Sequence, residues 1–268
     1  MSGFLVDLIA YDFLRNALFA SVLVGISTAM ISPVVVYKRM EFIGDGTAHA
    51  AFAGLAMGIV LGFEYRTAAV GTAVVFALVI SLLSRRQRIS ENSAIGMLLP
   101  VFMSLGVIIL SFSRRYVTDV MSYLFGDILL VQTTDLYFLL GITIVLSLLL
   151  YLYRYDILYF LSDEHMANFY GLKTNLVRTV FLVAISVIVV GAVKVAGVIL
   201  VGAFIVIPGL VGKMLGKSFL QVILVAIAHN VLVSVVGLFL SYHLDLPPGP
   251  TMVLLSFGIF VSVYTVSG

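Results

Sequence analysis

The sequence has 268 residues, of which 62% are hydrophobic and 10% are charged, and its mean hydropathy is +1.20. A soluble domain cannot cover its surface with so few polar residues, so the composition predicts an integral membrane protein. The formal net charge is +2, and the basic residues are scattered over short loops, which argues against a nucleic-acid partner. The chain has no cysteine, which excludes disulfides, thiolate metal ligands and cysteine nucleophiles.

Hydrophobic blocks of about 17 to 24 residues, the length of a helix that crosses about 30 Å of hydrocarbon, alternate with short charged segments. The ten-residue alternation that is typical of an outer-membrane barrel does not occur in the sequence. We expect an all-α, polytopic transmembrane bundle of about nine spans that forms a single domain over residues 1–268. The expected spans are 14–36, 47–62, 67–84, 93–112, 133–153, 176–193, 197–212, 218–241 and 250–267.

The distribution of Lys and Arg predicts the orientation, because cytoplasmic loops carry the excess of basic residues. Successive gaps between spans lie on alternating sides of the membrane, and ten of the 15 Lys and Arg residues fall on one side. The ten are Lys38, Arg39, Arg85, Arg86, Arg88, Arg154, Lys173, Arg178, Lys213 and Lys217. This arrangement predicts that the N-terminus lies outside and the C-terminus in the cytoplasm.

Two stretches differ from plain spans. Residues 113–132 lie on the outer side and mix charges with an apolar run too short to cross the bilayer, which predicts a partly re-entrant or interfacial segment. Residues 154–175 form the longest cytoplasmic loop. Within it, SDEHMANFYG at 162–171 predicts a short helix with Ser162 as N-cap, acidic residues in the first turn and Gly171 at its end.

Near the start of the second span, an aspartate and a histidine lie four residues apart in FIGDGTAHAAFAGLAMG, residues 42–58. Residues at this spacing share a face of a helix, so Asp45 and His49 could present a carboxylate and an imidazole to one point. These ligand types suit zinc, manganese or ferrous iron, and an ionisable pair at membrane depth needs a partner or a water-filled path. In a structural alternative, Asp45 is the N-cap of the helix. The spacing alone leaves both interpretations open.

Small residues recur at every fourth position along the second span and would let another helix approach closely. They are Gly46, Ala50, Gly54, Gly58 and Gly62. This ridge lies about one hundred degrees round the helix from the Asp45/His49 pair. We therefore expect the second span to be pressed into the bundle, with its polar face also directed inward.

Other ionisable side chains give weaker indications. Carboxylates predicted on the outer side are better explained as solvated or capping groups; these are Glu64, Asp119 and Asp127. His229, with Asn230, lies inside the eighth span and could line a pore, although a bond to a neighbouring backbone carbonyl explains it better. His165 belongs to the short helix, and His243 and Asp245 lie at an outer turn rich in proline.

Five segments form a characteristic set. They are RMEFIGDGTAHAAFAGLAMG at 39–58, SENSAIGMLLPVFMSLGV at 90–107, SYLFGDIL at 122–129, VAGVILVGAFIVIPGLVGKML at 195–215 and LSYHLDLPPGPTMVL at 240–254. Together they resemble the permease subunits of bacterial ABC importers for zinc, manganese or iron, over nearly the whole chain. The Gly-Asp-x-x-x-His pattern of that family falls on Gly44, Asp45 and His49, so the resemblance favours a metal site at the pair.

The resemblance implies a multi-pass protein of the bacterial inner membrane that works as a homodimer around a central pathway. A zinc or manganese ion, or iron, would arrive from an extracytoplasmic metal-binding protein and would be driven inward by a separate ATPase subunit. The chain itself would then not be an enzyme and would hold no tight cofactor. The family's ATPase-docking helix would correspond to residues 162–171, with Asp163, Glu164, Ala167 and Gly171 as its docking residues.

The alternative function is a secondary cation carrier or channel that needs no ATPase. Binding of an ATPase through residues 154–175 would distinguish the two. VGKMLGKS, at 211–218, resembles a phosphate-binding loop only superficially, because Val211 replaces the first glycine and no strand precedes it. An intramembrane enzyme has no support, since the spacing singles out neither paired aspartates nor a Ser/His arrangement.

Overall fold

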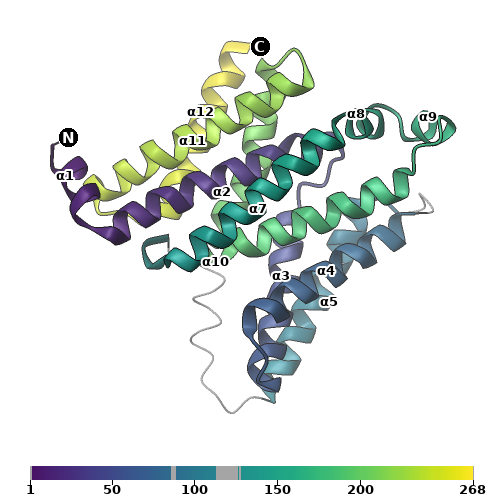
Figure 1. Ribbon diagram of the computed structural model, residues 1–268, viewed down its shortest axis with the longest axis horizontal. Coiled ribbons are helices and arrows are strands. Elements are labelled where there is room, and N and C mark those ends of the chain that lie inside the picture. The colour runs from purple at the N-terminus through teal and green to yellow at the C-terminus, as the bar shows by residue number, and fades with distance from the viewer. Residues whose placement is uncertain (1, 86–88, 113–125, 127, 268) are drawn as a thin grey trace. The chain divides into compact units, whose positions relative to one another are not determined.

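The computed structural model describes residues 2–85, 89–112, 126 and 128–267, which form helices and short connections and contain no strand (Figure 1). Eight of the described helices are long and apolar enough to cross a membrane. They are α2 (Asp12–Tyr37), α3 (Ile43–Leu61), α4 (Tyr65–Ser84), α5 (Glu91–Ser111), α7 (Thr133–Leu152), α10 (Thr174–Leu215), α11 (Phe219–Leu244) and α12 (Pro248–Ser267). Shorter elements are α1 (Ser2–Ala10), the 3-10 turn η1 (Ile128–Leu130), α8 (Arg154–Ser162) and α9 (Glu164–Phe169). The predicted all-α class is confirmed.

The chain forms two compact units, each assembled from separate stretches of sequence. The α11–α12 unit comprises Met1–Val36, Phe125–Val145 and Gly191–Gly268. The α3–α5 unit comprises Tyr37–Leu124 and Leu146–Val190, and it also contains α8, α9 and the first part of α10. Helices α7 and α10 each contribute to both units.

In the α3–α5 unit, helix α3 packs against both α4 and α5 (Figure 1). The small residues of α3 make this close approach possible. A Cβ at Gly54 would collide with the Thr72 hydroxyl and the Ala68 carbonyl of α4, and one at Gly46 would press on the Phe76 ring. The ridge predicted along the second span therefore does bring neighbouring helices close.

In the α11–α12 unit, polar side chains join helices inside an otherwise apolar interior. The Asn230 amide of α11 donates to the carbonyl of Gly25 in α2 and to that of Phe204 in α10, each at 3.0 Å. The hydroxyls of Ser27 in α2 and Thr143 in α7 lie 2.7 Å apart. Such bonds replace the hydrophobic driving force that helices lack in lipid.

Two of the predicted spans, 176–193 and 197–212, are successive parts of the 42-residue element α10. Its helix is interrupted at Gly197, which has φ 76° and ψ 162°. Gly126, which also has a positive φ, lies against this point, and a Cβ on Gly126 would meet the Gly197 backbone nitrogen. Both positions therefore favour glycine, Gly197 for its backbone angles and Gly126 for this close approach as well.

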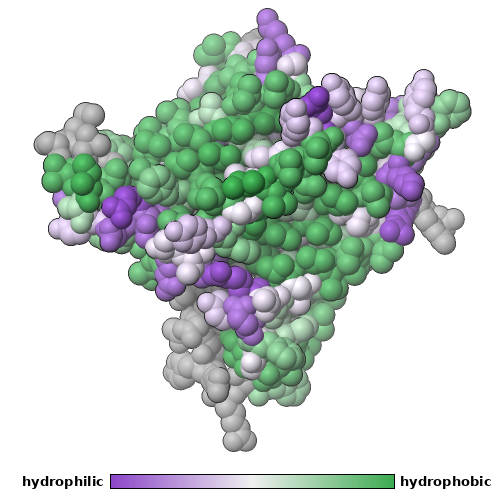
Figure 2. Space-filling model, viewed as in Figure 1, coloured by the Kyte–Doolittle hydropathy of each residue, from purple (hydrophilic) through white to green (hydrophobic). Residues whose placement is uncertain are grey.

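Apolar side chains cover most of the visible face over α2, α7 and α10, and hydrophilic side chains gather where helices end (Figure 2). Ile144 and Leu148 of α7 and Leu254 and Phe257 of α12 are among the exposed apolar residues. Water disfavours exposure on this scale, whereas lipid tails solvate it.

Candidate metal site

Helix α3 begins at Ile43, four residues before the expected start of the second span. The Ile43 N–H donates to the Met40 carbonyl at 3.0 Å, which closes a turn ahead of the helix. Phe42 occupies the N-cap position and makes no side-chain capping bond. Asp45 therefore lies within the first helical turn, and its interpretation as the N-cap is wrong, because the backbone is already helical two residues earlier.

Asp45 and His49 lie one turn apart on α3, and both are half-buried, whereas Gly44, Gly46 and Ala50 beside them are buried. Residues four apart share a face of a helix, so the two side chains lie on the same side of α3. Within the part of the chain that the structure describes, Nδ1 of His49 is buried and has no hydrogen-bond partner. A buried nitrogen without a partner is costly unless a ligand satisfies it.

The other sides of α3 are occupied by protein. The Thr47 hydroxyl lies 3.4 Å from the Ser186 hydroxyl of α10, and both residues are fully buried. Gly46 packs on Phe76 and Ile95. The face that carries the pair is thus the side on which an ion could reach α3.

A carboxylate and an imidazole fit a first-row divalent ion. Among the described residues, no group of three or more His, Asp or Glu side chains could hold a metal ion. The pair would supply two ligands, and the coordination sphere of an ion there would need further donors.

The short helix predicted at 162–171 is present as α9, but its start differs from the expectation. Ser162 is not its N-cap: it is the last residue of α8, and its hydroxyl donates to the Leu158 carbonyl at 2.8 Å. Asp163 caps α9 instead, since its Oδ1 accepts from the Met166 N–H at 3.0 Å. Serine and aspartate are both favoured at the N-cap, so the sequence alone does not distinguish Ser162 from Asp163 as the cap.

Gly171 ends α9 with φ +85°. The Leu172 N–H donates to the Ala167 carbonyl and the Gly171 N–H to the Asn168 carbonyl, each at 3.0 Å. This pair of bonds is a Schellman motif, which places a left-handed residue just beyond the helix. Backbone geometry thus explains the glycine at 171.

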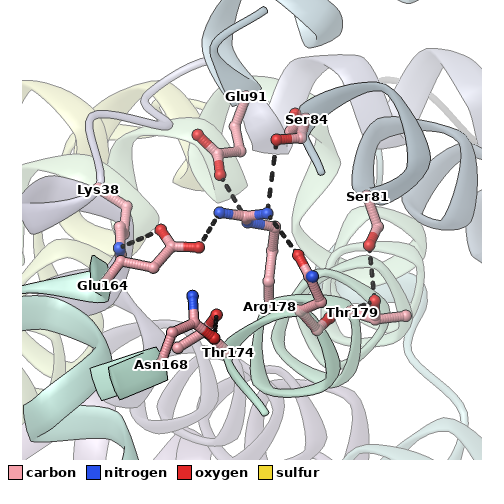
Figure 3. A network of polar contacts seen from close by, with 10 residues as sticks. Lys38, Ser81, Ser84, Glu91, Glu164, Asn168, Thr174, Arg178 and Thr179 are labelled. Atoms are coloured by element: carbon pink, nitrogen blue, oxygen red, sulfur yellow. Dashed lines mark hydrogen bonds and ion pairs between the residues drawn. The ribbon is translucent and has the colours of Figure 1, made fainter. Parts of the chain in front are cut away.

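The side chains of α9 divide into inward and outward sets. Glu164 forms ion pairs with Lys38, at 3.4 Å, and with Arg178 (Figure 3). Ala167 is buried, with 2% of its surface exposed. The large exposed side chains of α9 and the residue after it are Met166, Phe169 and Tyr170.

A sequence model of the ABC 3 transport family matches residues 10–267. The chain belongs to the ABC 3 transport family. It is 49% identical over 260 residues to a probable metal transport system membrane protein of Thermotoga maritima, covering 97% of this chain and 92% of that one. It is 30% identical to the manganese transport system membrane protein MntC of Listeria monocytogenes, covering 96% and 91%. Among solved structures, PsaBC from Streptococcus pneumoniae in complex with Fab matches with a TM-score of 0.86 and 27% identity, covering 98% and 95%.

Membership of the ABC 3 family confirms the resemblance to permeases of metal ABC importers. The chain is a multi-pass membrane permease of an ABC importer and has no catalytic role of its own. The metal ligands and the docking residues within this ABC 3 permease stay predictions, as does the homodimer.

Three further candidates have structural roles in this ABC 3 permease. Glu64 caps α4, accepting from the N–H groups of Arg66 at 3.1 Å and Thr67 at 2.7 Å. Desolvation raises the pKa of Glu64, but these bonds more than offset it and hold the pKa below its usual value. His229 bonds through Nε2 to the Ser256 hydroxyl at 2.8 Å, so the expected bond to a backbone carbonyl is wrong; its Nδ1, like that of His49, has no hydrogen-bond partner among the described residues. His243 approaches the Phe239 carbonyl at 3.0 Å through Nδ1.

Some expectations lie outside the described residues of the ABC 3 permease. These are Asp119, Asp127, the side chain of His165 and most of the segment 113–132. By contrast, Arg178 is prominent in the structure, although its place in the sequence predicts only orientation. The available signal was a lone guanidinium inside a predicted apolar span, because such a charge requires partners.

Proposed function

We propose that this permease forms the pathway of an ATP-driven importer for a divalent first-row metal ion, zinc, manganese or iron, in the bacterial inner membrane. Asp45 and His49 bind the ion on its way through. The observation that carries the proposal is the half-buried carboxylate and imidazole on α3, with the buried Nδ1 of His49 lacking a partner among the described residues. The relative named for manganese transport supports this class of ion.

The pathway forms between two copies of the chain. Among its described residues, one copy contributes one carboxylate and one imidazole at this point, fewer ligands than a divalent ion held by protein usually has. A homodimer would bring two of each to a shared axis, a donor set that suits first-row ions. Selectivity among these ions then depends on geometry and on the extracytoplasmic protein that delivers the metal.

The ATPase partner docks on the cytoplasmic side, on α9. Asp163 and Gly171 are exposed and stay candidates for contact, while Met166, Phe169 and Tyr170 offer the apolar surface. We assign the inward-facing Glu164 and Ala167 to holding α9 in place. Exposed aromatic side chains are suited to such an interface, because large contact areas anchor protein partners.

The proposal is tested by uptake of radiolabelled manganese and zinc into cells that lack their own importers and express the permease with its ATPase. Asp45→Asn and His49→Gln should each lower uptake by at least about tenfold, since loss of even the groups that orient metal ligands has effects of that size. The matched controls are Asp12→Asn and His243→Gln, which alter an exposed carboxylate and an exposed imidazole elsewhere.

Full uptake by both α3 variants would remove the metal site from the pair. Uptake that persists without the ATPase would show a carrier or channel in place of an ATP-driven importer. Membrane levels of every variant are compared by immunoblot, so that loss of protein is separated from loss of transport.

A further inference from the structure

A buried arginine stands at the centre of a cluster of charges in the α3–α5 unit (Figure 3). Arg178 of α10 is only 3% exposed. Its Nη2 pairs with Glu164, the first residue of α9, and its Nε lies 2.9 Å from Oε1 of Glu91, the first residue of α5. The Glu91 oxygen lies off the N–H direction, so this second contact is an ion pair without a formal hydrogen bond.

The remaining guanidinium nitrogen, Nη1, contacts two further groups. Nη1 donates to the Asn175 side chain at 3.1 Å and approaches the Ser84 carbonyl, at the end of α4, at 3.5 Å. Only a planar, multidentate group can contact separate helices in this way. Arg178 thereby touches α4, α5 and α9 from its place on α10.

Lys38 extends the cluster to the connection between α2 and α3. Its ammonium lies 3.4 Å from the second Glu164 oxygen and 3.6 Å from the centre of the Phe160 ring. Burial lowers the pKa of Lys38 from its usual value, and the neighbouring Glu164 carboxylate opposes that effect. Lys38 stands five residues before the first residue of α3, the helix that carries Asp45.

The charges of the cluster are balanced and buried, so none of them can move without an energetic cost. Two cations and two carboxylates balance in charge, and each is mostly buried, so displacing one leaves an opposite charge uncompensated. A further hydrogen bond joins α9 to α10, because the Thr174 hydroxyl donates to the Asn168 side chain at 2.7 Å. A displacement of α9 must therefore move its neighbours with it or break buried ion pairs.

We propose that Lys38, Glu164, Arg178 and Glu91 form the link that transmits movement of α9 to α5 and α3. This inference rests on the proposed function, in which the ATPase docks on α9. Glu164 receives the movement, Arg178 passes it to Glu91 at the start of α5, and Lys38 passes it to the chain that leads into α3. In this proposal Arg178 and Glu91 are positioning residues, which act through Glu164 and the helices and not by binding the metal or the ATPase.

Glu91→Gln tests the link most cleanly. It retains the size of the side chain and removes the charge that ties Arg178 to α5, whereas Arg178→Ala would leave two buried carboxylates without a cation and endanger folding. Glu64→Gln is the matched control, since Glu64 also stands at a helix start of the same unit but, among the described residues, bonds within its own turn.

The permease–ATPase complex in liposomes is assayed for both uptake of radiolabelled manganese and ATP hydrolysis. Glu91→Gln should lower uptake about tenfold, the size of a typical coupling between sites, while hydrolysis and retention of the ATPase stay unchanged. Glu64→Gln should alter none of the three. If uptake and hydrolysis fell together, or if uptake were unaffected, the link would be refuted.

A second measurement needs neither metal nor ATPase, so it separates failure of the link from failure of the proposed function. The chain has no native cysteine, which lets spin labels be placed singly at the exposed positions Phe169→Cys on α9 and Met97→Cys on α5. In the purified permease, the distance distribution between these labels should be narrow and should broaden with Glu91→Gln but not with Glu64→Gln. An unchanged distribution with Glu91→Gln would overturn the link, even where uptake by the wild-type protein confirmed the importer.

Discussion

Single residues of α9 and of the turn that follows it have roles that their chemical type did not reveal. Gly171 is suited to docking as a small residue, yet its φ of +85° and the Schellman bonds around it show a geometric requirement. Glu164 resembles a solvated first-turn carboxylate, yet Lys38 and Arg178 hold it inward. For these residues, the backbone angle of Gly171 and the ion-pair partners of Glu164 indicate the role better than the residue type does.

Gly171→Ala should loosen the end of α9. A Cβ in the left-handed region costs about 1–2 kcal/mol, which the short helix cannot absorb. We expect amide hydrogen exchange across residues 163–173 to accelerate roughly tenfold, measured by mass spectrometry on the purified permease. Gly141→Ala is the control, because Gly141 lies in α7 with open space around it; equal exchange in the two variants would contradict the requirement for glycine at 171.

The predictability of the candidate site also divides by residue. Asp45 and His49 could be found from sequence because their spacing is local and a helix converts it directly into proximity. The Arg178 cluster could not, since Glu91, Glu164 and Lys38 reach it from distant parts of the chain. A charged residue in an apolar segment indicates that it has partners, but the partners can be identified only from the folded structure.

Among the elements, the long helices were predictable because the bilayer sets the length of a spanning helix, and the hydrophobic blocks of the sequence have that length. The interruption of α10 was expected as a loop between two spans, whereas the structure has one element with a single non-helical residue at Gly197. The short helices α1 and α8 were missed, since they lack the length that makes a membrane helix conspicuous. The start of α3 was misplaced because Gly44 and Asp45 resemble a helix boundary in sequence.

The ridge of α3 gives a prediction for helix packing. Gly54→Leu should destabilise the protein by about 1–3 kcal/mol, because the added carbons overlap Thr72 and the Ala68 backbone of α4. Gly71→Leu is the matched control, since a Cβ at Gly71 meets nothing within 4 Å. Thermal unfolding of the detergent-solubilised permease compares the two variants, and equal midpoints would show that α3 and α4 do not need this close approach.

For the whole molecule, the distribution of basic residues predicts an N-terminus outside and a C-terminus in the cytoplasm. The same rule places the connection between α3 and α4 outside and α9 in the cytoplasm. The docking proposal depends on this orientation, because an ATPase reaches only the cytoplasmic side.

Single cysteines test the orientation without interference from native thiols, because the chain has none. Phe63→Cys, exposed between α3 and α4, should react with a membrane-impermeant maleimide in intact spheroplasts. Phe169→Cys, 82% exposed at the end of α9, should react only after the membrane is permeabilised. The reverse pattern would invert the orientation and remove α9 as the docking site.

The four charges around Arg178 have one more consequence, which concerns the membrane potential. A single elementary charge that crosses 100 mV gains or loses about 2.3 kcal/mol, enough to bias a conformational change. Lys38 and Arg178 together cancel Glu91 and Glu164, so the cluster displaced as a unit carries no net charge through the field. If the link moves as proposed, its movement is therefore electrically silent, and we expect the membrane potential neither to open nor to close the permease through it.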